Sequence, residues 1–179
     1  MILFLGPKNS GKTVLLKRLQ EETFHSLNKY SDIPATVSTV GTNIVHLKST
    51  STKEAIIVQE IGGQMSPIWN EYIDDCEAIV FVVDSSDVCI LSESSILLLN
   101  LVKESVPKQK RLCVVLNKTD IKGIITVNEI FKDLLFLDSL TKRFSREIEV
   151  FECSAVTAKG LHQLYECAVT DKGLHQLYE

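Results

Sequence analysis

The sequence lacks a long apolar run. Nowhere in its 179 residues is there a stretch near the ~18 apolar residues that a membrane-spanning helix needs. Met1–Leu5 is too short for the apolar core of a signal peptide. Ile2 stands where myristoylation needs glycine, and the chain ends without a prenylation box. We therefore expect a cytoplasmic protein, in which any peripheral contact with a membrane comes through a partner or through a signal that the sequence does not display.

An excess of one charge is also lacking. Nineteen Lys and Arg stand against 23 Asp and Glu, a net charge of −4. Because phosphate contacts need clustered basic residues, this balance excludes a dedicated nucleic-acid binder. With 45% hydrophobic and 23% charged residues, the composition also excludes collagen-like and disordered chains. The length fits one domain.

Closely spaced cysteine pairs are absent. The cysteines are odd in number, form no C-x-x-C pair, and lie at positions 76, 89, 113, 153 and 167. This pattern favours a reduced chain with small buried thiols, and a metal site is the less favoured alternative.

The sequence does contain an alternation of short apolar runs and helical patterns. The predicted strands are Ile2–Leu5, Asn43–Leu47, Ala55–Val58, Ala78–Val83, Leu112–Leu116 and Glu147–Phe151, of which the second and third form a hairpin. The predicted helices are Thr13–Gln20, Leu91–Val102 with Ser92 as candidate cap, Glu129–Leu137, and a last helix from near Leu161. The order predicts an α/β fold with a mostly parallel six-stranded sheet and helices on both faces.

The end of the chain repeats itself. Residues 152–166 read ECSAVTAKGLHQLYE, and residues 166–179 read ECAVTDKGLHQLYE. Two short copies cannot share a solenoid core, which needs at least three repeats. We therefore expect one domain over residues 1–166, with 167–179 either extending the last helix or arising from a duplicated coding segment.

A glycine-rich loop follows the first predicted strand. Its sequence, GPKNSGKT, fits G-x-x-x-x-G-K-[ST] at every fixed position, and a helix follows it. Backbone N–H groups of such a loop, together with the helix N-terminus, bind phosphate oxygens. We expect Lys12 to reach the β- and γ-phosphates and the Thr13 hydroxyl to ligate Mg²⁺. A simple turn with a surface lysine is the disfavoured alternative. The predicted phosphate-binding residues are Gly6, Pro7, Lys8, Asn9, Ser10, Gly11, Lys12 and Thr13.

A second polar motif, Asn117–Asp120, reads NKTD and follows the apolar run at 112–116. Ligands of open α/β sheets bind at the carboxyl ends of strands. Alone, the tetrapeptide is better explained as a polar turn, but behind a phosphate loop it predicts a guanine site. Asp120 offers two acceptors to the N1 and N2 donors of guanine, which adenine lacks. We expect Asn117 to hold the base and the loop, and the Lys118 stem to cover the sugar and ring.

Two further segments complete the predicted site. In Cys153–Ala155, Ser154 and Ala155 could present a backbone N–H to guanine O6. In the run EIGGQ, Glu60 could hold Mg²⁺ through a water, Gly63 could bind the γ-phosphate, and Gln64 could orient the attacking water as the catalytic residue. The alternative for EIGGQ is a Gly-Gly turn with solvated Glu and Gln.

The order GPKNSGKT, STVGTN, EIGGQ, NKTD, CSA resembles the Ras-like small GTPases, in particular the Arf and Arf-like branch. Thr39–Asn43 is similar to the Arf switch I segment T-[IV]-G-x-N, Pro67–Tyr72 resembles switch II, and FVVDSSD looks like the strand end of that branch. Within the branch, the resemblance is strongest to the divergent group called Arf-like protein sixteen. It covers residues 1–166.

The resemblance implies a Ras-like P-loop GTPase fold and a switch that binds GTP or GDP with Mg²⁺. It also implies slow GTP hydrolysis that depends on an activating protein, and work in membrane or ciliary traffic, hence a location on endomembranes or at the cilium. Thr39 is implied to place its hydroxyl on Mg²⁺ and its N–H on the γ-phosphate. From the residues alone, a threonine at a strand entry explains Thr39 equally well.

The same resemblance implies a monomer that meets effector, exchange-factor and activating proteins through Thr39 and Gln64–Tyr72. Trp69 and Tyr72 are either exposed anchors for such partners or core residues, and the sequence leaves both open.

The chain also departs from the Arf pattern. Gln59-Glu60 stands where Arf proteins have Trp-Asp, and the stretch from Gln64 to Pro67 is two residues shorter. Both changes touch residues implied in hydrolysis. They motivate an alternative in which the protein is a binding module, a hydrolysis-deficient pseudo-GTPase that holds nucleotide but barely turns it over. A P-loop kinase is a weaker alternative, because it leaves NKTD unexplained.

Overall fold

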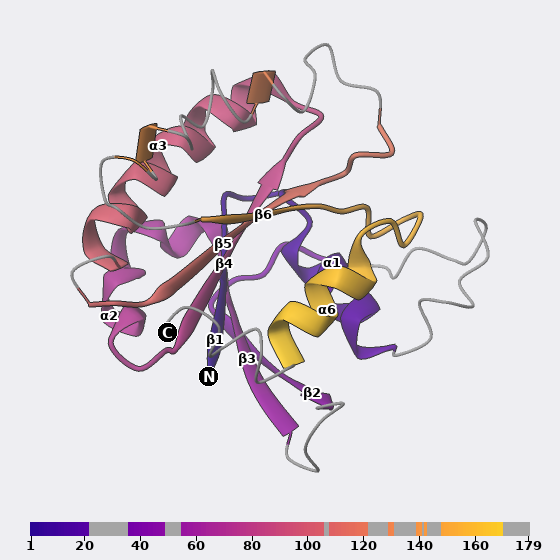
Figure 1. Cartoon of the computed structure of the whole chain (residues 1–179), viewed down its shortest axis with the longest axis horizontal. Helices are drawn as coiled ribbons and strands as arrows, with labels where there is room; N and C mark the ends of the chain where they lie inside the picture. Colours follow the sequence, from indigo (N-terminus) through magenta and orange to yellow (C-terminus); the bar gives the residue numbers. More distant parts are fainter. Residues whose placement is uncertain are drawn as a thin grey trace.

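The computed structural model describes residues 1–21, 36–48, 55–105, 108–121, 129–130, 139–140, 142 and 148–169. These residues form one six-stranded sheet in the order β2-β3-β1-β4-β5-β6 (Figure 1). The strands are β1 Ile2–Leu5, β2 Thr42–Lys48, β3 Ala55–Ile61, β4 Ala78–Asp84, β5 Arg111–Asn117 and β6 Glu149–Glu152. β2 and β3 pair antiparallel, and every other neighbouring pair is parallel. The predicted mostly parallel sheet is therefore confirmed.

Helices cover both faces of the sheet, as predicted (Figure 1). They are α1 Lys12–Gln20, the 3-10 helix η2 Gly63–Ile68, α2 Asn70–Ile73, α3 Val88–Ser105 and α6 Leu161–Val169. Side chains alternate along the central strands, so Ile2 and Phe4 pack toward α1 and α6 while Leu3 and Leu5 pack toward α2 and α3. Because both faces are covered, β1 is apolar at every position and β4 at every position but the last, Asp84.

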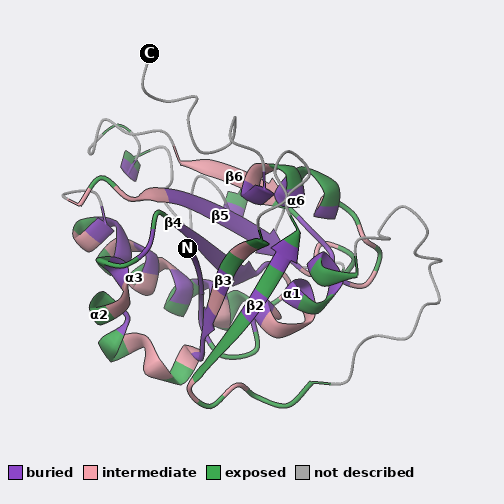
Figure 2. Ribbon diagram, turned by 90° about the horizontal axis from the view of Figure 1, so that it is seen from below, coloured by how far each residue is buried: buried purple, intermediate pink, exposed green. Residues whose placement is uncertain are grey.

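The sheet is buried at its centre and exposed at one edge. Figure 2 shows β4 and β5 largely buried and β2 largely exposed, and all four residues of β1 are buried as well. Only Val45 and Leu47 of β2 face the core as buried residues. In the part of the chain that the structure describes, no helix is long and apolar enough to cross a membrane.

Two details of α3 differ from the sequence prediction. The helix begins at Val88, where the Asp87 carboxylate accepts the Cys89 N–H at 2.9 Å, so Asp87 is the capping residue. Ser92 lies inside the helix and donates its hydroxyl to the Val88 carbonyl. Within α3 the apolar side chain of Ile96 is 65% exposed.

Other predicted boundaries shift slightly or lie outside the described residues. The last strand covers Glu149–Glu152 in place of the predicted Glu147–Phe151. Of the predicted helix Glu129–Leu137, only residues 129–130 are described. The second copy of the C-terminal repeat is described only to Val169, where α6 ends. The predicted domain end near residue 166 therefore stays a prediction.

Candidate functional site

The loop between β1 and α1 has a backbone that only glycine tolerates at two positions. Gly6 and Gly11 have φ values of 146° and 89°. A Cβ on Gly6 would lie 2.2 Å from the Val82 carbonyl oxygen, and one on Gly11 would lie 2.4 Å from Asn117 Nδ2. The two glycines thus let the loop turn tightly at the carboxyl end of the sheet, directly before the N-terminus of α1.

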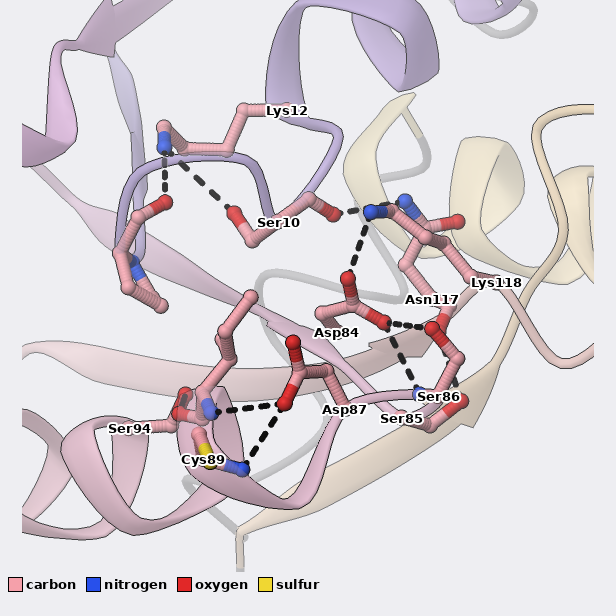
Figure 3. A network of polar contacts seen from close by, with 12 residues as sticks. Ser10, Lys12, Asp84, Ser85, Ser86, Asp87, Cys89, Ser94, Asn117 and Lys118 are labelled. Atoms are coloured by element: carbon pink, nitrogen blue, oxygen red, sulfur yellow. Dashed lines mark hydrogen bonds and ion pairs between the residues drawn. The ribbon is translucent and has the colours of Figure 1, made fainter. Parts of the chain in front are cut away.

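Lys12 places its ammonium group inside this loop. Its Nζ donates to the carbonyl oxygens of Gly6 and Pro7, both at 2.9 Å, and lies 3.5 Å from Ser10 Oγ (Figure 3). Burial lowers the pKa of Lys12 to about 8, an effect that the nearby Glu60 carboxylate opposes. A buried ammonium with a lowered pKa is stabilised by any anion that enters the loop.

The three predicted Mg²⁺ ligands meet beside the loop, although they come from separate segments. Thr13 Oγ1 lies 2.9 Å from Thr39 Oγ1 and donates to Glu60 Oε1 at 2.5 Å. Thr39 also donates to Glu60 Oε1, at 3.2 Å. Glu60 is only 1% exposed. Hydroxyl and carboxylate oxygens are the hard donors that Mg²⁺ prefers, so this donor set fits that ion.

The segment after β3 packs directly on the loop. A Cβ on Gly63 would lie 2.3 Å from the Lys8 backbone nitrogen, so no side chain fits there. Gln64, the first residue beyond, is exposed and lines the cleft above the loop. The predicted catalytic residue is therefore at the cleft.

The cleft has a volume of about 460 Å³. It is lined by the glycine-rich loop, the start of α1, residues 36–39, Glu60, Gly63, Gln64 and Lys118. Asp120 and Ser154 are not among its lining residues. They lie next to each other instead, with Ser154 Oγ donating to Asp120 Oδ1 at 2.6 Å.

The NKTD segment is joined to the glycine-rich loop by a hydrogen bond. Asn117 Nδ2 donates to the Ser10 carbonyl at 2.9 Å, which connects the two predicted motifs (Figure 3). Asn117 is 1% exposed, and its Oδ1 has no hydrogen-bond partner among the described residues. A buried amide oxygen of this kind can accept from a ligand at no further desolvation cost.

Asp84 joins this network, although no sequence motif predicted a role for its carboxylate. Its Oδ2 lies 2.5 Å from Lys118 Nζ, and its Oδ1 accepts from both the N–H and the hydroxyl of Ser86 (Figure 3). The Asp84 side chain is only 3% exposed. The signal was present in the sequence, because Asp84 is the single charged residue in the otherwise apolar strand β4.

Trp69 proves to be a core residue. It is 3% exposed, and its ring meets that of Phe81 edge-on with the centroids 6.2 Å apart. Of the two alternatives that the sequence left open, the exposed anchor is therefore wrong for Trp69. Tyr72 is half-buried.

Comparison with known proteins agrees with this geometry. The sequence profile of the ADP-ribosylation factor (Arf) family matches residues 1–171. The human ADP-ribosylation factor-like protein 16 is 33% identical over 162 residues, which cover 90% of this chain and 80% of that protein. The ADP-ribosylation factor-like protein 3 of Chlamydomonas reinhardtii is 35% identical over 164 residues, covering 90% of this chain and 84% of that protein.

The fold is also found in a solved structure. The Arl6 BBS3 small GTPase of Trypanosoma brucei, solved with the nucleotide analogue GppNp, superposes with a TM-score of 0.73 at 23% identity, covering 90% of each chain. The fold is therefore the Ras-like GTPase fold that the motif order implied. Because the family profile matches residues 1–171 of the 179-residue chain, the chain belongs to the ADP-ribosylation factor family of small GTPases.

Proposed function

We propose that the protein is a guanine-nucleotide switch that binds GTP and GDP with Mg²⁺ and hydrolyses GTP slowly. The observation that carries this proposal is the meeting of three distant motifs at one edge of the sheet. The glycine-rich loop contacts Thr39 and Glu60 through Thr13 and contacts the NKTD segment through Ser10, and residues of all three segments line one cleft. Membership of the Arf family supports the same assignment.

In this proposal the loop holds the phosphates and NKTD holds the base. Lys12 turns its Nζ from the Gly6 and Pro7 carbonyls toward the β- and γ-phosphates. Asp120 accepts the two guanine donors, and the Lys118 stem covers the ring. Ser154 and Ala155 complete the base site, since the bond from Ser154 to Asp120 fixes the carboxylate beside them.

We propose that the Thr13 and Thr39 hydroxyls bind Mg²⁺ directly and that Glu60 does so through a water. Bound Mg²⁺ supplies charge neutralisation at the β- and γ-phosphates. Thr39 is the last residue of the segment 36–39 that lines the cleft, so ligation of Mg²⁺ by Thr39 holds this segment in place. Loss of the γ-phosphate on hydrolysis would release it. Gly63 contacts the phosphate loop from the other side, and its N–H is directed to the γ-phosphate in the same proposal.

The identity of the nucleotide tests the proposal. Mass spectrometry of the nucleotide retained by natively purified protein should find GDP or GTP, and adenine nucleotides there would contradict it. Asp120→Asn should move preference from guanine to xanthine nucleotides, because an amide offers one acceptor and one donor where guanine needs two acceptors. Unchanged guanine affinity would place the base elsewhere. Lys12→Ala should abolish tight binding.

The binding-module alternative is tested separately. Glu60 in place of aspartate and the short segment after Gln64 are the observations that favour it. Single-turnover GTP hydrolysis should be slow in the native chain and slower in Gln64→Leu, with nucleotide affinity retained. A native rate equal to that of the variant would remove Gln64 from the mechanism and favour binding without turnover. An activating protein is expected to raise the native rate by supplying positive charge to the transition state.

We propose that partner proteins read the switch through Thr39 and through the exposed residues of Gln64–Tyr72. In that stretch Gln64, Pro67, Ile68, Asn70 and Glu71 are exposed. These partners are effector, exchange-factor and activating proteins. We propose that the chain acts as a monomer, that it is located in the cytoplasm, and that it regulates membrane or ciliary traffic. Charge reversal at Glu71 tests the surface, because it should weaken partner binding without changing nucleotide affinity.

A further inference from the structure

Far from the nucleotide cleft, two cysteines and a glutamate converge between the sheet and α6. Cys113 comes from β5, Glu149 from β6 and Cys167 from α6. The two sulfur atoms are 4.0 Å apart, and Glu149 Oε2 lies 4.0 Å from Cys113 Sγ and 3.3 Å from Cys167 Sγ. Three segments separated in sequence therefore place three potential metal ligands within 4.8 Å of one another.

These spacings match the edges of a tetrahedral zinc site. With Zn–S bonds of about 2.3 Å and Zn–O bonds of about 2.0 Å, tetrahedral angles place two sulfurs about 3.8 Å apart and a sulfur and an oxygen about 3.5 Å apart. The observed separations of 4.0, 4.0 and 3.3 Å differ from these edges by a few tenths of an ångström. One ion can thus reach all three atoms with small side-chain adjustments.

The surroundings balance the charge of such a site. Two thiolates and a carboxylate carry three negative charges, against which a divalent ion and the Arg111 guanidinium supply three positive ones. Arg111 Nη2 donates to Glu149 Oε1 at 2.7 Å, which leaves Oε2 directed at the sulfurs, and it lies 3.1 Å from Cys167 Sγ. An outer group that fixes a ligating carboxylate in this way is a usual feature of metal sites.

A small cavity lies beside the two thiols. It has a volume of about 10 Å³ and is lined by Cys113, Cys167 and Arg111 together with apolar residues of β1, β4 and α6, while Glu149 is not among its lining residues. This volume is about that of one small bound species. Cys113 is 3% exposed, whereas Cys167 and Glu149 are half-buried, so the ion would lie at the edge of the interior, where a water can reach it.

We propose that Cys113, Cys167 and Glu149 bind one Zn²⁺ ion, with a water as fourth ligand. Binding converts two thiols to thiolates, forms two Zn–S bonds and one Zn–O bond, and releases two protons to solvent. Because binding releases protons, zinc affinity rises with pH. The ion connects α6 to β5 and β6, and the site does not depend on the proposed nucleotide function.

The test uses the full chain loaded with GDP and excess Mg²⁺, so that oxygen sites are filled. One equivalent of Co²⁺ should produce thiolate-to-cobalt charge transfer and the strong visible bands of a tetrahedral site, and Zn²⁺ should displace it. Octahedral Co²⁺ bound to oxygen ligands gives no charge transfer. Zn²⁺ should bind with one-to-one stoichiometry by calorimetry and raise the melting temperature.

Three variants and one control define the site. Cys113→Ser and Cys167→Ser should lose the charge-transfer band, and Glu149→Gln should lower zinc affinity at least ~10-fold. Cys167 is half-buried and tolerates serine more readily than Cys113, so its variant decides if Cys113→Ser fails to fold. Cys89→Ser is the matched control, because Cys89 is exposed and outside the cluster, and it should bind Zn²⁺ normally.

Each contrary outcome overturns the proposal. Absence of stoichiometric zinc binding by the native chain would do so, as would a cobalt spectrum that persists in Cys167→Ser. A Cys113–Cys167 disulfide in freshly prepared protein, seen as the loss of two hydrogens in intact mass, would replace the metal site by a covalent link.

Discussion

Asp84→Asn removes one charge from the interior while keeping the shape of the side chain. The Asp84 carboxylate is 3% exposed and accepts from Lys118 and from two donors of Ser86. Hydrogen bonds to a charged group each contribute about 1.5–3 kcal/mol. The Lys118 side chain is 30% exposed and can turn to water, so the loss is well below that of a fully buried pair.

From these contacts we expect the free energy of unfolding to fall by about 2 kcal/mol, because asparagine can still accept from Ser86 but cannot balance the ammonium. In a chain of this size that loss lowers the melting temperature by ~4–8 °C. Lys118 also loses the contact that orients its stem over the proposed base site. Ordering one such side chain costs about 0.5–1.5 kcal/mol, so GDP affinity should fall up to ~10-fold.

Thermal unfolding of the GDP-loaded chain and titration with a fluorescent GDP analogue measure the two effects. Asp87→Asn is the matched control, because Asp87 lies three residues on and caps α3 from an exposed position, a role that asparagine fills equally well. The control should leave both quantities unchanged. If Asp84→Asn behaves like Asp87→Asn in both assays, the ion pair neither stabilises the fold nor positions Lys118.

Three further predictions follow from the geometry. The pKa of Lys12, which burial lowers to about 8, must rise when a phosphate binds beside it. GDP binding near pH 8 should therefore take up about half a proton per chain, and GDP affinity should fall as the pH rises further. Calorimetry in buffers of different ionisation enthalpy measures the proton uptake, and zero uptake would refute the prediction. Gly160→Ala should destabilise the chain by several kcal/mol in urea unfolding, because its Cβ would lie 2.0 Å from the Glu152 carbonyl oxygen at a φ of 71°; an unchanged midpoint would contradict the close approach. Trp69→Ala should cost ~3–5 kcal/mol of stability, and a fully stable variant that only loses partner binding would restore the exposed-anchor interpretation.

The sheet was predictable because its strands carry strong local signals. Ile2–Leu5 and Ala78–Val83 are apolar at every position, which is typical of a strand that has helices packed on both faces of its sheet. The structure places both strands at the centre of the sheet. The start of α3 was missed because Asp87 and Ser92 are equally good caps in sequence. The choice depends on which residue ends the turn after β4, and that is set by the Asp84–Ser86 hydrogen bonds.

The candidate site was predictable where a motif is contiguous and less so where contacts join segments. GPKNSGKT predicted the tight glycine-rich loop that the structure has between β1 and α1, but no local pattern links Asp84 to Lys118 or Cys113 to Cys167. These contacts depend on strand order and register, which bring residues 34 and 54 positions apart together. The buried position of Trp69 likewise follows from packing on Phe81, which its own neighbourhood in the sequence does not encode.

The hydrogen bond from Asn117 to the Ser10 carbonyl has a consequence for how the chain folds while it is being translated. The two residues are 107 positions apart. At ordinary rates of translation, about 5–20 s pass after Ser10 is made before Asn117 is added. Until β5 emerges from the ribosome, the glycine-rich loop has its contacts to β4 and to the segment after β3 but lacks the hydrogen bond from Asn117. Nucleotide capture should therefore be a late step of folding on the ribosome, and truncated chains that end before β5 should not retain GDP.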